Sequence, residues 1–117
     1  QIQFKDIFNS VHPDIKAQMQ QYGGIDHPFE IGKQGMKVEN KHFQLTVETD
    51  MPNVVIFTFN DTTEWESDFN IYKPHSGVAL ETQYLPNDIN NEGNKAKSIL
   101  KANVPFYAKT IYHISEK

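Results

Sequence analysis

The stretch that decides the fold is Ser76-Gly77-Val78-Ala79-Leu80-Glu81-Thr82-Gln83-Tyr84-Leu85-Pro86-Asn87, whose alternating pattern predicts a β-strand. A period of two gives the strand one face with Val78, Leu80, Thr82 and Tyr84 and another with Gly77, Ala79, Glu81 and Gln83. Glu is disfavoured in strands and is rarely buried alone, so Glu81 indicates an open, concave surface where a polar group lies against it. On alternation alone, a half-exposed strand with a solvated Glu is the simpler interpretation.

The rest of the chain predicts more short strands and a single short helix. The helix is expected over residues 14–21, between Pro13 and Gly23-Gly24. Further strands are expected over residues 28–33, 36–39, 42–49, 53–60, 69–72 and 105–114. The 53–60 segment is apolar on both faces, which suits a strand in the middle of a sandwich. Two long polar loops are expected, over residues 61–68 and 87–97. The pattern as a whole predicts an all-β, antiparallel β-sandwich.

Composition excludes several classes of partner. A chain of 117 residues is one domain at most, and its net charge of −4 with no arginine disfavours nucleic acid. Without arginine, the chain also lacks the guanidinium group that binds carboxylates and phosphates through two parallel hydrogen bonds. With no cysteine, the chain suits a reducing compartment, so cytoplasm is expected. No segment is long and apolar enough to predict a membrane span, so a membrane is not an expected partner.

Two motifs of the chain are informative together. The segment Tyr72–Pro86, with Glu81-Thr82-Gln83 at its centre, resembles the C-terminal part of the galactose mutarotase (aldose 1-epimerase) family. Gly23-Gly24-Ile25-Asp26-His27-Pro28-Phe29 is similar to the family's glycine-rich approach to an Asp-His pair. The resemblance covers nearly all of this chain but only the last part of the family's chain.

The resemblance implies a fold and a division of the domain. Residues 1–117 would be the C-terminal segment of a single mutarotase-like domain, the C-terminal portion of a β-supersandwich. Its sheet edges are then expected to pair with the missing N-terminal part. The implied partners are this N-terminal part and a monosaccharide substrate, and no cofactor is implied.

The resemblance also implies a reaction and roles for particular residues. The activity would be that of an isomerase, an aldose 1-epimerase that interconverts the α and β anomers of free aldoses such as galactose or glucose. Glu81 would be the catalytic base, provided that its site is shielded enough for desolvation to raise its pKa toward the working pH. Asp26 would accept hydrogen bonds from sugar hydroxyls; without the resemblance, a helix-terminating loop with a capping Asp is the alternative. Gln83 and Phe29 are further candidates for contact with the sugar.

The proton donor of the reaction is not predicted within this chain. In the family it is a histidine from an upstream segment, and neither His27 nor His75 matches it, so the chain alone is expected to be inactive. None of the five histidines shows zinc-type spacing, so no metal site is predicted. The loop from Asp88 to Gly93 resembles the start of an EF-hand but has Ile99 at the twelfth position, where Glu is required.

Two alternatives to the epimerase stay open. One is a non-catalytic carbohydrate-binding or sensing protein with the same fold. The other is an epimerase for a modified or phosphorylated sugar, which would need arginines from upstream to hold the anion. Aromatic residues such as Trp65 could stack on a sugar, although in an all-β chain they are more often part of the core.

Overall fold

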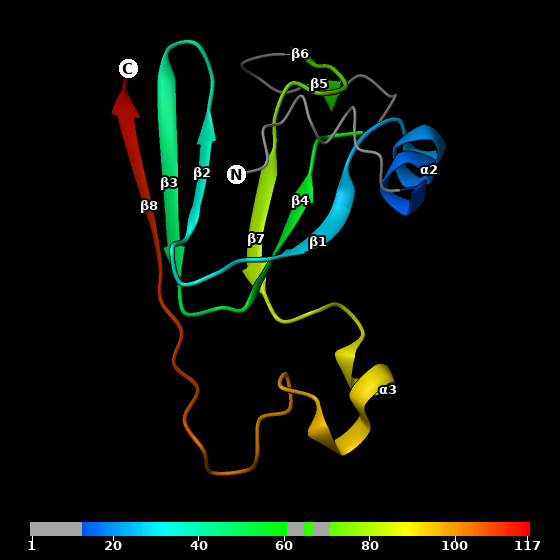
Figure 1. The fold of residues 1–117 in the computed structure, drawn as a ribbon, viewed down its shortest axis with the longest axis vertical. Helices are drawn as coiled ribbons and strands as arrows, with labels where there is room; N and C mark the ends of the chain where they lie inside the picture. The colour runs from blue at the N-terminus through cyan, green and yellow to red at the C-terminus, as the bar shows by residue number, and fades with distance from the viewer. Residues whose placement is uncertain (1–12, 61–64, 67–70) are drawn as a thin grey trace. The chain divides into compact units, whose positions relative to one another are not determined.

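The computed structural model describes residues 13–60, 65–66 and 71–117 (Figure 1). These residues divide into two compact units. The first unit contains the chain up to His27 together with Val55–Glu81, and the second contains Pro28–Val54 together with Thr82–Lys117. The division runs through three strands, so that each unit holds a part of each of them.

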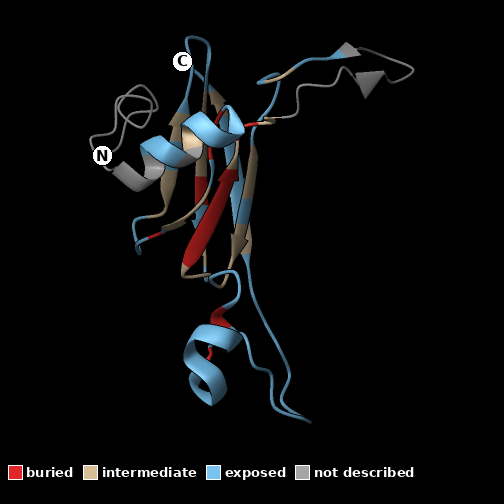
Figure 2. Ribbon diagram, turned by 90° about the vertical axis from the view of Figure 1, so that its right-hand side faces the viewer, coloured by how far each residue is buried: buried red, intermediate tan, exposed pale blue. Residues whose placement is uncertain are grey.

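Those three strands form a sheet with the order β1-β4-β7. Their bounds are Asp26–Glu30 for β1, Asn53–Phe57 for β4 and Ala79–Gln83 for β7. The central strand β4 is buried at its first four residues, which appear red in Figure 2, and this confirms the prediction of a strand enclosed on both faces. The Thr58 N–H donates to the Ile25 carbonyl at 3.0 Å, and the Ile31 N–H donates to the Pro52 carbonyl at 2.9 Å. These bonds at opposite ends of β1 and β4 identify an antiparallel pair.

Helix α2 in the first unit confirms the helix expected over residues 14–21, because it spans Pro13–Tyr22. It ends at Gly23, whose φ of 71° lies in the left-handed region that favours glycine. Two short strands, β5 (Trp65–Glu66) and β6 (Ile71–Tyr72), pair antiparallel in the same unit. The other residues of the expected 61–68 loop, and residues 69 and 70 of the expected 69–72 strand, lie outside the described residues.

The second unit contains an antiparallel sheet with the order β2-β3-β8. Its strands are β2 (Met36–Glu39), β3 (Phe43–Thr49) and β8 (Thr110–Glu116). The expected bounds of β2 and β3 are confirmed to within one residue, since alternation and flanking turns mark both. Val47 in the centre of β3 is 0 % exposed and lies opposite Met36 and Tyr112 in the register.

Three threonine hydroxyls form a chain in the second unit. The Oγ1 atoms of Thr49 and Thr110 lie 2.8 Å apart, and the Oγ1 atoms of Thr110 and Thr82 also lie 2.8 Å apart. The Met51 N–H donates to Thr49 Oγ1 at 3.1 Å. These hydroxyl contacts link β3 and β8 to Thr82, the residue that follows Glu81 in β7.

Two predictions about the C-terminal third were wrong. The expected loop over residues 87–97 contains a helix, α3 (Asp88–Glu92), and a 3₁₀ turn over Gly93–Lys95. The expected strand over residues 105–114 begins only at Thr110 and continues to Glu116. Pro105 has no N–H to give to a ladder, and the first bonds that fix the strand are those between Lys109 and Asp50.

The other differences concern strand ends. The strand expected over residues 28–33 is β1, which starts earlier and ends at Glu30 because the chain then turns from Gly32 to Gly35. The strand expected over residues 53–60 ends at Phe57, and Phe59 has a φ of 50°. The stretch from Ser76 to Asn87 is a strand only over Ala79–Gln83. Turn geometry at His75 and Asn87, both with a φ of 63°, shortens it at its two ends.

Asp88 closes the loop that contains α3. The residue is 8 % exposed, and its carboxylate accepts hydrogen bonds from the Ser98 hydroxyl and, at 3.1 Å, from the Ser98 N–H. These bonds, led by the one from the hydroxyl, hold the pKa of Asp88 below its ordinary value of 3.8. Helix α3 therefore begins at a carboxylate that is bonded to Ser98, ten residues further along the chain, which the local sequence does not reveal.

Acid is expected to destabilise the protein through Asp88. Because the folded-state pKa is depressed, the stabilisation is present above the unfolded-state pKa and is lost as the pH falls through the folded value. The Asp88→Asn variant should therefore be less stable than the parent at neutral pH and lose less of its stability as the pH falls below 3.8. Urea unfolding over that pH range measures both effects. Glu92→Gln, an exposed carboxylate on the same helix, should keep the parent's pH dependence; equal slopes for the parent and Asp88→Asn would contradict the assignment.

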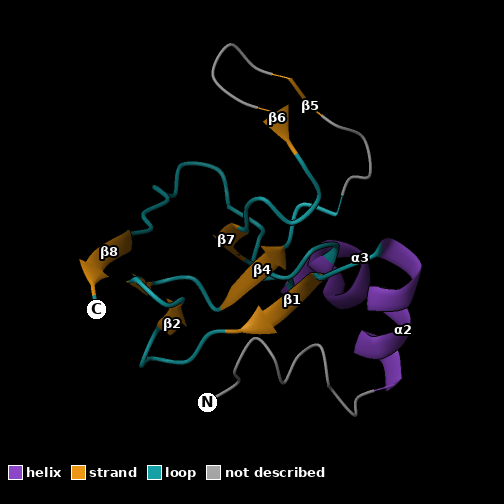
Figure 3. Cartoon of the chain, turned by 90° about the horizontal axis from the view of Figure 1, so that it is seen from above, coloured by secondary structure: helices purple, strands orange, loops and turns teal. Residues whose placement is uncertain are grey.

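Strands make up most of the regular structure, and the paired strands are antiparallel (Figure 3). The chain therefore has the all-β class that the sequence predicts, with the antiparallel sheets of a β-sandwich. Among the described residues, none of the helices has the length and apolar character needed to cross a membrane.

Candidate functional site

Glu81 lies in the middle of β7, in the first unit. Its side chain is exposed, whereas its neighbours Leu80 and Thr82 are half-buried. Ala79 and Gln83, which alternation places on the same face as Glu81, are also half-buried, so β7 does not show the one open face that alternation predicts. The described residues do not enclose Glu81, so the shielding that a general base needs is not provided by this part of the chain.

Asp26 is the first residue of β1, and it too is exposed and belongs to the first unit. It therefore opens a strand, and the alternative of a capping residue in a helix-terminating loop is wrong. Asp26 and Glu81 are carried by the two strands that flank β4. Since neighbouring strands lie about 4.8 Å apart, the strands that carry the two carboxylates are about 10 Å apart.

The other two candidate residues belong to the second unit. Gln83 is half-buried in β7, and its Nε2 donates to the Tyr84 carbonyl at 3.1 Å. Phe29 is half-buried in β1. Trp65 falls in β5, but its side chain lies outside the described residues.

A closed hydrogen-bond network holds the peptide that precedes Asp26. The Ile25 N–H donates to Thr58 Oγ1 at 2.9 Å, and the Thr58 hydroxyl donates to Asn60 Oδ1 at 2.6 Å. Asn60 Nδ2 donates to the Ile25 carbonyl at 2.9 Å, which completes the ring. Ile25 and Thr58 are 1 % and 4 % exposed, so these bonds form largely out of contact with water. Both backbone polar groups of Ile25, its N–H and its carbonyl, are therefore bonded by side chains from a distant part of the sequence.

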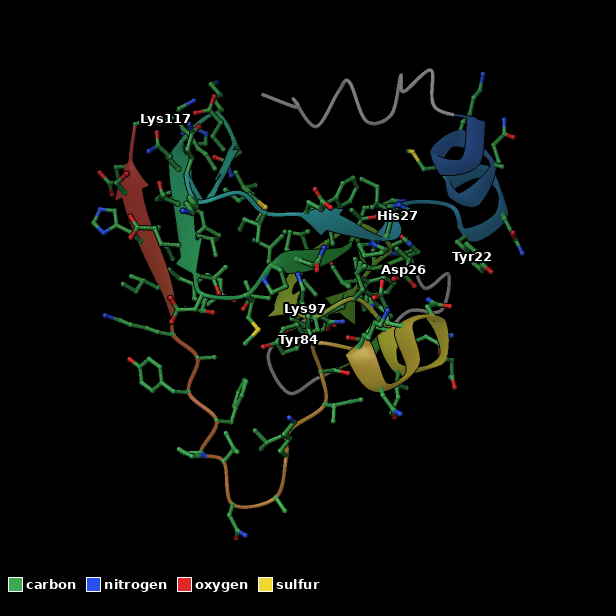
Figure 4. All side chains as sticks on the ribbon, turned by 60° about the horizontal axis from the view of Figure 1, so that its bottom comes forward. Tyr22, Asp26, His27, Tyr84, Lys97 and Lys117 are labelled. Atoms are coloured by element: carbon green, nitrogen blue, oxygen red, sulfur yellow. The ribbon has the colours of Figure 1, made fainter. Side chains whose placement is uncertain are left out.

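His75 contacts the same segment from the turn that leads toward β7. Its Nδ1 lies 3.1 Å from the Thr58 carbonyl, and its backbone N–H donates to the Phe59 carbonyl at 2.9 Å. A carbonyl can only accept, so Nδ1 carries the proton and Nε2 is the acceptor nitrogen of the neutral ring. His27 follows Asp26 in the extended backbone of β1, where alternation directs its side chain to the opposite face (Figure 4).

Thr58 and Asn60 were not predicted from the sequence, because they lie more than 30 residues from Ile25 and belong to no local motif. The one signal was Gly24, where a Cβ would stand 2.0 Å from Asn60 Oδ1 and 2.6 Å from Thr58 Oγ1. A glycine at this position shows that side chains pack close to the turn, but the sequence does not reveal which ones.

The described residues contain no group of three or more His, Cys, Asp or Glu side chains that could hold a metal ion. The arrangement instead offers two exposed carboxylates, Asp26 and Glu81, on a sheet whose turns are fixed by amide and hydroxyl groups. Such groups can accept hydrogen bonds from the hydroxyls of a polyol, and a carboxylate can take a proton from one of them.

Comparison with known proteins identifies a family for the chain. No curated protein gives a significant match to the sequence. The family model for aldose 1-epimerase matches residues 5–113, a range that contains both Asp26 and Glu81. Since the match extends over nearly the whole chain, the protein belongs to the aldose 1-epimerase family.

Proposed function

We propose that this chain is part of an aldose 1-epimerase that interconverts the α and β anomers of free aldoses such as galactose or glucose. The observation that carries the proposal is that the family match spans two exposed carboxylates on strands of one sheet. The lack of arginine supports a neutral sugar over a phosphorylated one, since no guanidinium is available here to hold an anion. The lack of cysteine supports a cytoplasmic location.

In the proposed reaction, Glu81 acts as the general base. Its carboxylate takes the proton from the anomeric hydroxyl while an acid protonates the ring oxygen, and the bond between the anomeric carbon and the ring oxygen breaks. Rotation of the resulting aldehyde and the reverse proton transfers close the ring on either face. Asp26 accepts hydrogen bonds from sugar hydroxyls, and Gln83 and Phe29 contact the sugar. No cofactor is needed, because the reaction only moves protons.

The acid and the shielding of Glu81 are proposed to come from an N-terminal part of the same domain, of which this chain is the C-terminal segment. Support comes from the exposed apolar residues of β8 and the segment that leads into it. Ile114 is 70 % exposed and Tyr107 is 78 % exposed, which is unusual for side chains of this kind unless another surface covers them. This additional polypeptide would exclude water and thereby strengthen proton transfer at Glu81.

Polarimetry of freshly dissolved α-D-galactose and α-D-glucose tests the proposal, with the protein expressed from its complete reading frame. The rate of approach to the equilibrium rotation should rise in proportion to protein concentration, with a kcat on the order of 1–10³ s⁻¹. Glu92→Gln, which removes an exposed carboxylate in α3, should match the parent. No acceleration of either sugar would contradict the proposal.

One observation favours a second candidate, a non-catalytic carbohydrate-binding protein. Glu81 and Asp26 are both exposed among the described residues, as suits groups that bind hydroxyls without transferring protons. This candidate predicts sugar binding, seen by calorimetry, without any acceleration of the change in rotation.

A further inference from the structure

The segment from Thr58 to Asn60 lies between the two turns that lead to the proposed site residues. On one side, Thr58 and Asn60 bind the peptide of Ile25, the residue before Asp26. On the other side, the carbonyls of Thr58 and Phe59 accept hydrogen bonds from His75, in the turn before the strand of Glu81. All of these residues belong to the first unit. One short segment therefore holds the approaches to both carboxylates.

We propose that Asn60 is a positioning residue for Asp26, acting through the Ile25 peptide; the inference rests on the proposed function. Its amide is used at both ends, with Oδ1 accepting from the Thr58 hydroxyl and Nδ2 donating to the Ile25 carbonyl. The Thr58 hydroxyl has a single proton, and the 2.6 Å contact to Asn60 takes precedence over the 3.4 Å contact to the Ile25 carbonyl. The ring thus has one consistent direction of donation.

An amide at position 60 is the group that this ring requires. A carboxylate could still accept from Thr58 but would place a second acceptor against the Ile25 carbonyl, where the two oxygens repel each other. Gly24 leaves the room for the amide, since a side chain at Gly24 would overlap it. Asn60 does not itself reach the sugar in this proposal; it sets the direction from which Asp26 enters β1.

The test combines Asn60→Asp with Asp26→Asn in the protein from the complete reading frame, using initial rates of anomer interconversion by polarimetry. Asn60→Asp should raise KM about tenfold while kcat stays within a factor of about two, because Asp26 binds the sugar and does not transfer a proton. In the Asp26→Asn background, Asn60→Asp should raise KM no further, since the group through which it acts is already altered. Asn91→Asp, the same change at an exposed position of α3, should leave KM unchanged.

A second pair of variants covers the case in which Asn60→Asp does not fold. Thr58→Ser keeps the hydroxyl of the ring and should keep the parent's KM, whereas Thr58→Val has nearly the same shape without the hydroxyl and should raise KM. A fall in thermal stability with an unchanged KM, or effects of Asn60→Asp and Asp26→Asn that multiply, would overturn this inference and leave the proposed function standing. A parent that neither binds nor interconverts the sugars would overturn the proposed function, and this inference with it.

Discussion

Replacing Glu81 by Gln is expected to lower the kcat of anomer interconversion by roughly 10²- to 10⁴-fold, the usual contribution of a positioned general base. The amide keeps the size of the carboxylate but cannot accept the proton of the anomeric hydroxyl. Because Glu81 is exposed in β7, the substitution should change the free energy of unfolding by no more than about 0.5 kcal/mol. Loss of activity would then be a chemical effect and not a consequence of unfolding.

Polarimetry gives the rate, and calorimetric titration with galactose gives the affinity. Glu48→Gln is the matched control, because Glu48 is also an exposed glutamate within a strand. It should keep the parent's kcat, and Glu81→Gln should keep most of the parent's affinity for the sugar. A Glu81→Gln variant with the parent's kcat would exclude Glu81 as the base.

Replacing Gly35 by Ala is expected to lower the free energy of unfolding by roughly 2–3 kcal/mol. Gly35 has a φ of 71°, which L side chains rarely adopt, and a Cβ at this position would stand 2.4 Å from the Val47 carbonyl oxygen. Val47 is fully buried in β3, so its backbone cannot move away without disturbing the pairing of β2 with β3. The loss is large compared with the marginal stability of small domains.

Urea unfolding at neutral pH measures this effect, and Gly32→Ala is the control. Gly32 lies in the same turn, and a Cβ there meets no atom within 4 Å. Its unfolding midpoint should stay near that of the parent. Gly35→Ala with the same midpoint as Gly32→Ala would show that neither the φ of Gly35 nor the contact with Val47 limits stability.

Local sequence patterns predict those parts of the fold that local forces decide. The end of helix α2 at the glycine pair, the alternation of β3 and the apolar run of β4 were all recognisable, since each depends on neighbouring residues. Helix α3 is not predicted because five residues are too few to show helical periodicity. The hydrogen bonds that hold its first residue, Asp88, come from Ser98, which is ten residues away. The start of β8 was misplaced because it depends on Asp50, which is 59 residues away.

The candidate site shows the same limit. Motifs single out Glu81 and Asp26, and Glu81 is exposed in β7, but Ala79 and Gln83 on the face that alternation assigns to it are half-buried. The two carboxylates lie on the strands that flank β4. This follows from the order of strands in the sheet, which a short sequence pattern cannot predict. The hydrogen bonds of Asn60 are even harder to predict from the sequence, because a single asparagine after a strand usually indicates only a turn.

The position of β8 at the edge of its sheet has a consequence for how the protein is made. In the sheet order of the described residues, β8 has β3 as its one neighbouring strand and is therefore an edge strand. Together with the exposed side chains of Ile111 and Ile114, this edge is a template on which a second copy can add. The rate at which two copies meet grows with the square of chain concentration. A slower rate of synthesis should therefore reduce the fraction of chains that pair through β8.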